Sequence, residues 1–186
     1  MREIKKRLRK ILDQDRYWHS LRVQKTAEKL ARFHGVDVKK ASLAGLLHDC
    51  ARWMTSSEMV AKAKCLGYKP SPIEILEPKL LHAYLSASEA KHSFGILDPE
   101  ILQAIERHTL GAKSMHALDK IIYLADHIEP ARNFPGVALL RKLVFQDMDA
   151  AIVISTSAMI KFLIKMRRPI SMQTIQTRNY YLNERN

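Results

Sequence analysis

Apolar residues recur at helical spacing along almost the entire chain, and this pattern limits the folds that it can adopt. Segments such as 18–34 and 118–128 repeat apolar side chains with a period close to 3.6 residues. We find no segment of four to eight residues that combines β-branched side chains with period-2 alternation. The sequence therefore predicts an all-α fold, a single compact bundle of many helices.

Helix start and stop signals divide the chain into segments. Thr55 and Glu58 have the spacing of a capping box, and Asp98 followed by Pro99 is typical of a helix start. Prolines between 70 and 78 indicate a loop with at most one short helical turn. After an amphipathic segment at 1–12, these signals predict helices over 18–34, 37–48, 55–67, 80–95, 98–108, 118–128, 137–146, 149–168 and 171–182.

Length and composition favour one domain inside the cell. A chain of 186 residues is about the size of one domain, so we expect a single domain over 1–186. Two cysteines are too few for a disulfide framework, and the charged start of the chain does not have the pattern of a signal peptide. The longest apolar stretch, 150–164, is too short to cross a bilayer and is expected to be a core helix. The chain is therefore expected to be cytoplasmic, without a membrane partner.

The chain carries a formal net charge of +12, which indicates attraction to anions. Nucleic acid, a membrane surface and a phosphate-rich small molecule are all compatible with this charge. Six of the first ten residues are basic, with apolar residues at helical spacing between them. We interpret this segment as a solvated amphipathic helix rather than a nucleic-acid-binding arm.

Potential metal ligands occur on five of the predicted helical segments, and most of them continue the apolar face of their own helix. A buried ionisable group needs a partner, and a metal ion is the simplest partner for several such groups. The helical periodicity predicts a metal site formed by His19, His48, Asp49 and Asp126, with His82 and His108 either as further ligands or handling phosphate. A set of imidazoles and carboxylates without thiolate suits Fe, Mn, Co or Zn.

The other candidate ligands have simpler interpretations. His34 precedes Gly35 and is expected at a helix C-terminus, where the dipole favours it. His92, His116 and His127 are interpreted as surface or capping residues, and Cys50 as a packed thiol.

Six stretches of this chain resemble the HD-domain phosphohydrolase superfamily, and within it the bacterial YqeK-type symmetrical diadenosine tetraphosphate hydrolases. The stretches are RYWHSLRV at 16–23, LAGLLHDCAR at 43–52, KLLHAYLSA at 79–87, HTLG at 108–111, KIIYLADHIEP at 120–130 and RNFPGV at 132–137. The chain departs from this family where Arg52 replaces a frequent Lys, and where Ala83 and Tyr84 replace a frequent Gly-Pro or Ala-Pro.

The resemblance implies an iron-dependent enzyme that cleaves bis(5'-nucleosyl) tetraphosphates in the middle and releases two nucleoside diphosphates such as ADP. It implies that His19, His48, Asp49 and Asp126 hold the first metal and that His82 and His108 hold a second metal or phosphate. Asp49 and Asp126 are also the expected catalytic residues, and Asp49 is the best candidate to bridge two ions. The native metal, the number of ions and homodimer formation are left open.

Polyphosphate recognition requires cations and hydrogen-bond donors near the metal ligands. Arg22 and Arg52 each follow a predicted ligand by three residues, and Arg132 lies just beyond the helix of Asp126, so all three could clamp phosphate oxygens. By resemblance, Arg16, Lys79, Thr109, Thr174 and Arg178 are further substrate-binding candidates.

Two rival functions remain at this stage. One is another HD-type enzyme, such as a nucleotidase, a deoxynucleoside triphosphate triphosphohydrolase or a cyclic dinucleotide phosphodiesterase. The other is a basic helical nucleic-acid-binding module that retains the histidines as structure, which we do not expect. Binding to RNA that depends on salt and not on chelator, without hydrolysis, would favour this second alternative.

Overall fold

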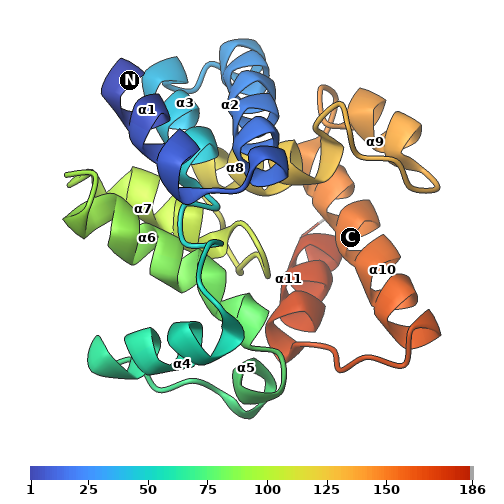
Figure 1. The fold of residues 1–186 in the computed structure, drawn as a ribbon. Helices are drawn as coiled ribbons and strands as arrows, with labels where there is room; N and C mark the ends of the chain where they lie inside the picture. The colour runs from blue at the N-terminus through green and yellow to red at the C-terminus, as the bar shows by residue number, and fades with distance from the viewer. Residues whose placement is uncertain (185–186) are drawn as a thin grey trace.

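The computed structural model describes residues 1–184, and it is built from helices joined by turns, with no strand among these residues (Figure 1). The predicted all-α fold is therefore confirmed. The helices are α1 (Arg2–Ile11), α2 (Gln14–His34), α3 (Val38–Leu47), α4 (Ser56–Cys65), α5 (Pro72–Leu76), the 3-10 helix η1 (Pro78–Leu81), α6 (His82–His92), α7 (Pro99–Arg107), α8 (Ala117–Ile128), α9 (Val137–Leu143), α10 (Met148–Lys165) and α11 (Met172–Asn183).

Local capping explains most of the helix boundaries. The Thr55 side chain and Glu58 form the predicted capping box at the start of α4, and Asp98 caps α7 with Pro99 at its first position. α2 begins four residues before the predicted start because the Asp13 side chain accepts a hydrogen bond from the Arg16 N–H. The helix predicted over 80–95 is instead the 3-10 helix η1, which begins at a proline, followed by α6.

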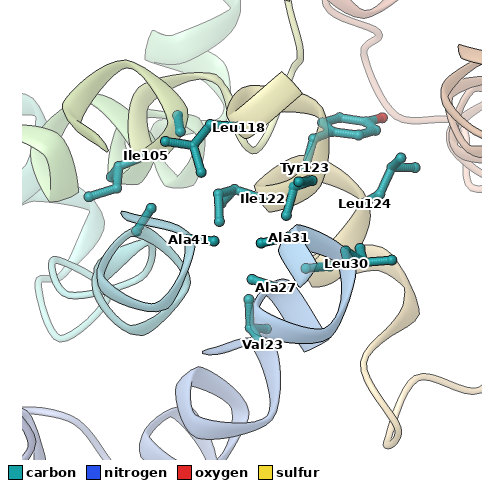
Figure 2. Packing of buried hydrophobic residues seen from close by; sticks show 14 of the residues in the cluster. Val23, Ala27, Leu30, Ala31, Ala41, Ile105, Leu118, Ile122, Tyr123 and Leu124 are labelled. Atoms are coloured by element: carbon teal, nitrogen blue, oxygen red, sulfur yellow. The ribbon is translucent and has the colours of Figure 1, made fainter. Parts of the chain in front are cut away.

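α2, α3 and α8 form the centre of the molecule, with α7 packed against α3 and α8. Figure 2 shows Val23, Ala27 and Ala31 in a row along α2, with Ala31 and Ala41 of α3 next to Ile122 of α8. Small side chains let α2 and α3 approach closely: a Cβ added to Gly45 of α3 would lie 3.1 Å from the Cα atom of Gln24. Burying these apolar faces provides the main stabilisation, at about 25 cal/mol per Å².

The remaining helices surround this centre. α4, α5 and η1 lie beyond α6, where Met59, Leu81 and Leu85 form a second small core, and α9, α10 and α11 lie on the opposite side (Figure 1). α10 is a core helix only in its first half, since Ile152 is buried whereas Phe162 and Ile164 are exposed. Across the described residues, every helix is too short or too polar to span a membrane.

Candidate metal centre

Six potential ligands from five helices and one turn converge beside the central core. His19 lies in α2 and Asp126 in α8, while His82 is the first residue of α6. His48 and His108 each follow the last residue of a helix, α3 and α7. Asp49 lies in the turn after α3. All six are buried except Asp126, whose side chain is 17% exposed. The structure thus brings the predicted ligands together from positions up to 107 residues apart in the chain, the separation of His19 and Asp126 (126 − 19).

Backbone contacts fix the orientation of three of the four imidazole rings. His48 donates its Nδ1–H to the Gly45 carbonyl at 2.8 Å, and His108 donates to the Ile105 carbonyl at 2.6 Å. His82 donates in the same way to the Lys79 carbonyl. Each acceptor lies three residues before its histidine. A carbonyl can only accept, so the Nδ1 atoms carry the protons and the Nε2 atoms present lone pairs.

The Nε2 lone pairs face one another at short distance. His19 Nε2 lies 3.2 Å from His48 Nε2 and 3.0 Å from an oxygen of Asp126. His82 Nε2 lies 3.1 Å from His108 Nε2. Facing lone pairs repel unless a cation lies between them. Two sets of ligand atoms lie within 4.8 Å of one another, His19 with His48 and Asp126, and His48 with Asp49 and His108. The donors present therefore fit divalent metal ions.

Asp49 lies between two sets of imidazoles, His19 with His48 and His82 with His108. Its Oδ2 atom is 3.7 Å from His48 Nε2 and accepts a hydrogen bond from Arg16 at 3.0 Å. Its Oδ1 atom is 3.2 Å from His82 Nε2 and 3.7 Å from His108 Nε2. Each oxygen of one carboxylate therefore faces a different set of imidazoles, which is the arrangement of a bridging ligand.

Burial and charge set the protonation states that metal binding requires. Burial lowers the pKa of His48, and it lowers the pKa of His108 to about 3, so both rings are neutral near pH 7. Burial opposes ionisation of Asp126, but the contact with His19 and the nearby charges, including that of Arg132, hold its pKa well below the usual value. The pKa of Asp49 is lowered in the same way, against burial, by the neighbouring imidazoles. Neutral imidazoles and ionised carboxylates are the forms that bind metals.

Glu129 supports the centre from behind, and the sequence reasoning missed it. This buried carboxylate accepts hydrogen bonds from Nδ1 of His19 at 3.2 Å and from Arg22 Nε at 2.7 Å. The first contact orients the His19 ring so that its Nε2 points at His48 and Asp126. The signal was available in the sequence, because Glu129 follows Asp126 by three residues and so shares its helix face.

A cleft of about 300 Å³ opens beside the predicted metal ligands. Four residues predicted to bind substrate line this cleft: Arg16, Arg52, Thr109 and Arg132. Three further lining residues, His127, Phe134 and Met159, were not predicted to bind substrate. His127, interpreted from the sequence as a surface or capping residue, is half-buried at the rim of this cleft, where its Nδ1–H donates to the Tyr123 carbonyl at 2.8 Å.

The other four substrate-binding candidates are not among the residues that line this cleft. Arg22 bonds Glu129, and Arg178 donates to the Ser157 hydroxyl at 2.8 Å. Thr174 is buried in α11, and the Lys79 side chain is exposed, while its carbonyl holds His82. Their role in binding substrate stays a prediction.

Comparison with known protein families shows which family this chain belongs to. Residues 16–131, which contain all six ligands, match the HD domain. This chain belongs to the HD domain family. The resemblance inferred from the six sequence stretches is confirmed, and the adjacent His48 and Asp49 are the pair that gives the family its name.

Several proteins resemble this HD domain protein over nearly their full length. It is 41% identical to the symmetrical bis(5'-nucleosyl)-tetraphosphatase of Halalkalibacterium halodurans, over 93% of this chain and 92% of that protein. It is 37% identical to the protein of the same name from Bacillus subtilis, over 92% of each chain. A crystal structure described as a predicted HD superfamily hydrolase involved in NAD metabolism, from Clostridium acetobutylicum, superposes with a TM-score of 0.95 at 39% identity, covering 98% of this chain and 96% of that one.

Proposed function

We propose that this HD domain protein is a metal-dependent hydrolase that cleaves bis(5'-nucleosyl) tetraphosphates symmetrically, releasing two ADP from diadenosine tetraphosphate. The observation that carries the proposal is the convergence of six ligand groups beside an arginine-lined cleft. The relatives that share 35% to 41% of its residues are symmetrical tetraphosphatases by name, which supports the same reaction here.

His19, His48, Asp49 and Asp126 would hold the first ion, and His82 and His108 would hold a second, with Asp49 between them. Iron is the proposed metal, as the family resemblance implies, and the nitrogen and oxygen donors suit Mn, Co and Zn as well. Cys50 would not contribute a thiolate, since burial raises the pKa of its thiol and its S–H donates to the Ser86 carbonyl. When bound, such ions neutralise phosphate charge and lower the pKa of a coordinated water.

Side chains around the metal centre are placed to bind and orient the substrate. Arg16 and Arg132 hold Asp49 and Asp126 in place and face the cleft, where their remaining N–H groups can bind phosphate oxygens. The Arg52 guanidinium lines the cleft without a hydrogen-bond partner among the described residues, so it is available to the polyphosphate. Asp126 reaches the cleft as an ionised carboxylate, and it stays a proposed catalytic residue as a ligand that would hold the ion beside the reacting phosphates.

The proposal includes the ligands, the domain bounds and the location of the enzyme. Its substrate and product are nucleotides. We propose a single domain over 1–186, in which α1 and α9 to α11 lie outside the matched HD segment. A cytoplasmic location is the corresponding proposal for its environment.

Product analysis tests the reaction directly. Diadenosine tetraphosphate incubated with the metal-loaded protein should yield ADP alone, separated by ion-exchange chromatography. Asp49→Ala should lose bound metal and lower kcat/KM at least about 10³-fold, because a ligand facing both sets of imidazoles is removed. Asp15→Ala, at an exposed position in the first turn of α2, is the control and should retain both. ATP plus AMP as products, or full turnover in Asp49→Ala, would refute the proposal.

A further inference from the structure

A second cavity adjoins the cleft at Thr109. It has a volume of about 490 Å³ and lies between α6, α7 and the segment that carries Tyr68. Thr109 lines both cavities, and its hydroxyl lies 3.1 Å from Nε2 of both His82 and His108. The second cavity therefore begins directly beside the metal ligands.

The lining of this cavity suits an uncharged aromatic ring with N–H donors. Tyr68 and Tyr84 both line it, and their rings stack on each other with centroids 4.3 Å apart and planes inclined by 29°. Nucleobases stack on such aromatic side chains. The Glu106 carboxylate also lines the cavity and has no hydrogen-bond or ion-pair partner among the described residues. It can accept from the N–H groups of a base, and its charge disfavours phosphate in this cavity.

Central cleavage of a symmetrical substrate requires room for a nucleoside on each side of the reacting bond. The cleft supplies arginines for the phosphates and apolar surface at Phe134 and Met159. The second cavity supplies the tyrosine pair and two carboxylates, those of Glu106 and of Glu74, which accepts a hydrogen bond from Tyr68. It has no lysine and one arginine, Arg107, whose guanidinium is already bound by Asp119 at 2.8 Å. The two cavities thus differ in chemistry in the way that phosphate and nucleoside differ.

We propose that the second cavity binds the nucleoside of the leaving half of the dinucleotide, with the base against Tyr84 and its N–H groups donating to Glu106. This inference rests on the proposed function, since it names a binding site for the same substrate. Thr109 then lies at the boundary between the reacting phosphates and the second nucleoside.

Comparing two substrates shows whether a variant in this cavity impairs nucleoside binding or impairs activity in general. Diadenosine tetraphosphate has two nucleosides, whereas adenosine 5'-tetraphosphate has the same central bond and one nucleoside, which the cleft can accommodate. Tyr84→Leu should lower kcat/KM for the dinucleotide about tenfold, through KM, because base stacking is lost. The same variant should change kcat/KM for adenosine tetraphosphate by less than about twofold.

Glu106→Ala provides a second variant at a solvent-accessible position, should Tyr84→Leu fold poorly. It should lower the preference for the dinucleotide over adenosine tetraphosphate about fivefold. Glu100→Ala is the matched control, since Glu100 is on the same helix but bonds Lys40 outside the cavity. This control should leave the preference unchanged.

Equal losses on both substrates would overturn the proposed nucleoside site, and so would unchanged preference in both variants. Failure of the proposed function would be seen separately, because the wild-type protein would then release no ADP from the dinucleotide. That result would also refute the proposed nucleoside site.

Discussion

Each imidazole at the metal centre is held from behind by an acceptor. Backbone carbonyls hold His48, His82 and His108, whereas His19 depends on the carboxylate of Glu129. Such outer contacts fix the ring tautomer and raise the basicity of the ligand. Glu129 also binds Arg22, so one buried carboxylate links a metal ligand to a cation at the surface of the site.

Replacing Glu129 should therefore weaken the centre without removing a ligand. Glu129→Gln should lower metal affinity about 10- to 100-fold, because the His19 ring loses its charged acceptor. Isothermal titration of the chelator-treated protein with Mn²⁺ measures this change. Asp15→Asn, at an exposed position in the first turn of α2, is the control. Equal affinities for Glu129→Gln and the wild type would show that the contact does not orient His19.

The buried histidines should make the metal-free protein sensitive to acid. His108 has its pKa lowered from 6.5 to about 3 by burial, and burial also lowers the pKa of His48. Between about pH 6.5 and pH 3 the unfolded chain binds protons that the folded chain does not, so the free energy of unfolding falls as the pH falls. The expected slope for His108 reaches about 1.4 kcal/mol per pH unit.

Urea unfolding of chelator-treated protein at several pH values between 6.5 and 4 measures this slope. His108→Gln should reduce it, whereas His92→Gln, at the exposed end of α6, should leave it as it is in the wild type. An identical slope in His108→Gln would show that this imidazole does not remain neutral in the folded protein.

The residues at the site were predictable to different degrees. His19, His48 and His108 stood out because they continue apolar helix faces, and the structure buries all three. His82 had a mixed face in the sequence, and it is buried because η1 turns it toward Asp49. Arg22 was expected to face phosphate, but its partner Glu129 is 107 residues away in the chain, a distance over which helical periodicity carries no information.

Helix ends place most of the ligands, and these ends were readable from the sequence. Asp37 caps α3 and Asp98 caps α7, as predicted, so the positions of His48 and His108 after these helices follow from local signals. The short helix α5 and the 3-10 helix η1 were predicted only as a loop with one turn. Three prolines in nine residues hide helices this short from periodicity.

The close contact of α2 and α3 sets the separation of His19 and His48. Gly45 permits it, because a Cβ at this position would lie 3.2 Å from the Ala27 Cβ and 3.1 Å from the Gln24 Cα. Gly45→Leu should push the two helices apart, costing about 1 to 3 kcal/mol of stability and weakening metal binding. Chemical unfolding and Mn²⁺ titration measure the two effects. Ser56→Leu on α4, outside this contact, is the control, and unchanged metal affinity in Gly45→Leu would contradict the account.

The arrangement of the helices turns scattered residues into one site. The all-α fold followed from periodicity, and the HD family followed from six short stretches in order. The two cavities that meet at Thr109 did not, because α6, α7 and the segment around Tyr68 form them only after packing. Part of the net charge of +12 is concentrated in the cleft, where Arg16, Arg52 and Arg132 lie around two carboxylates.

The central claim is that imidazoles and carboxylates from five helices and the turn after α3 bind divalent ions at the cleft. Anomalous scattering from crystals of the active protein grown with Mn²⁺ tests it most directly. The account predicts a peak within about 2.0 to 2.3 Å of His19 Nε2, His48 Nε2 and the carboxylate oxygens of Asp49 and Asp126. Crystals of active protein with no peak among these side chains, or with the metal bound only elsewhere, would contradict it.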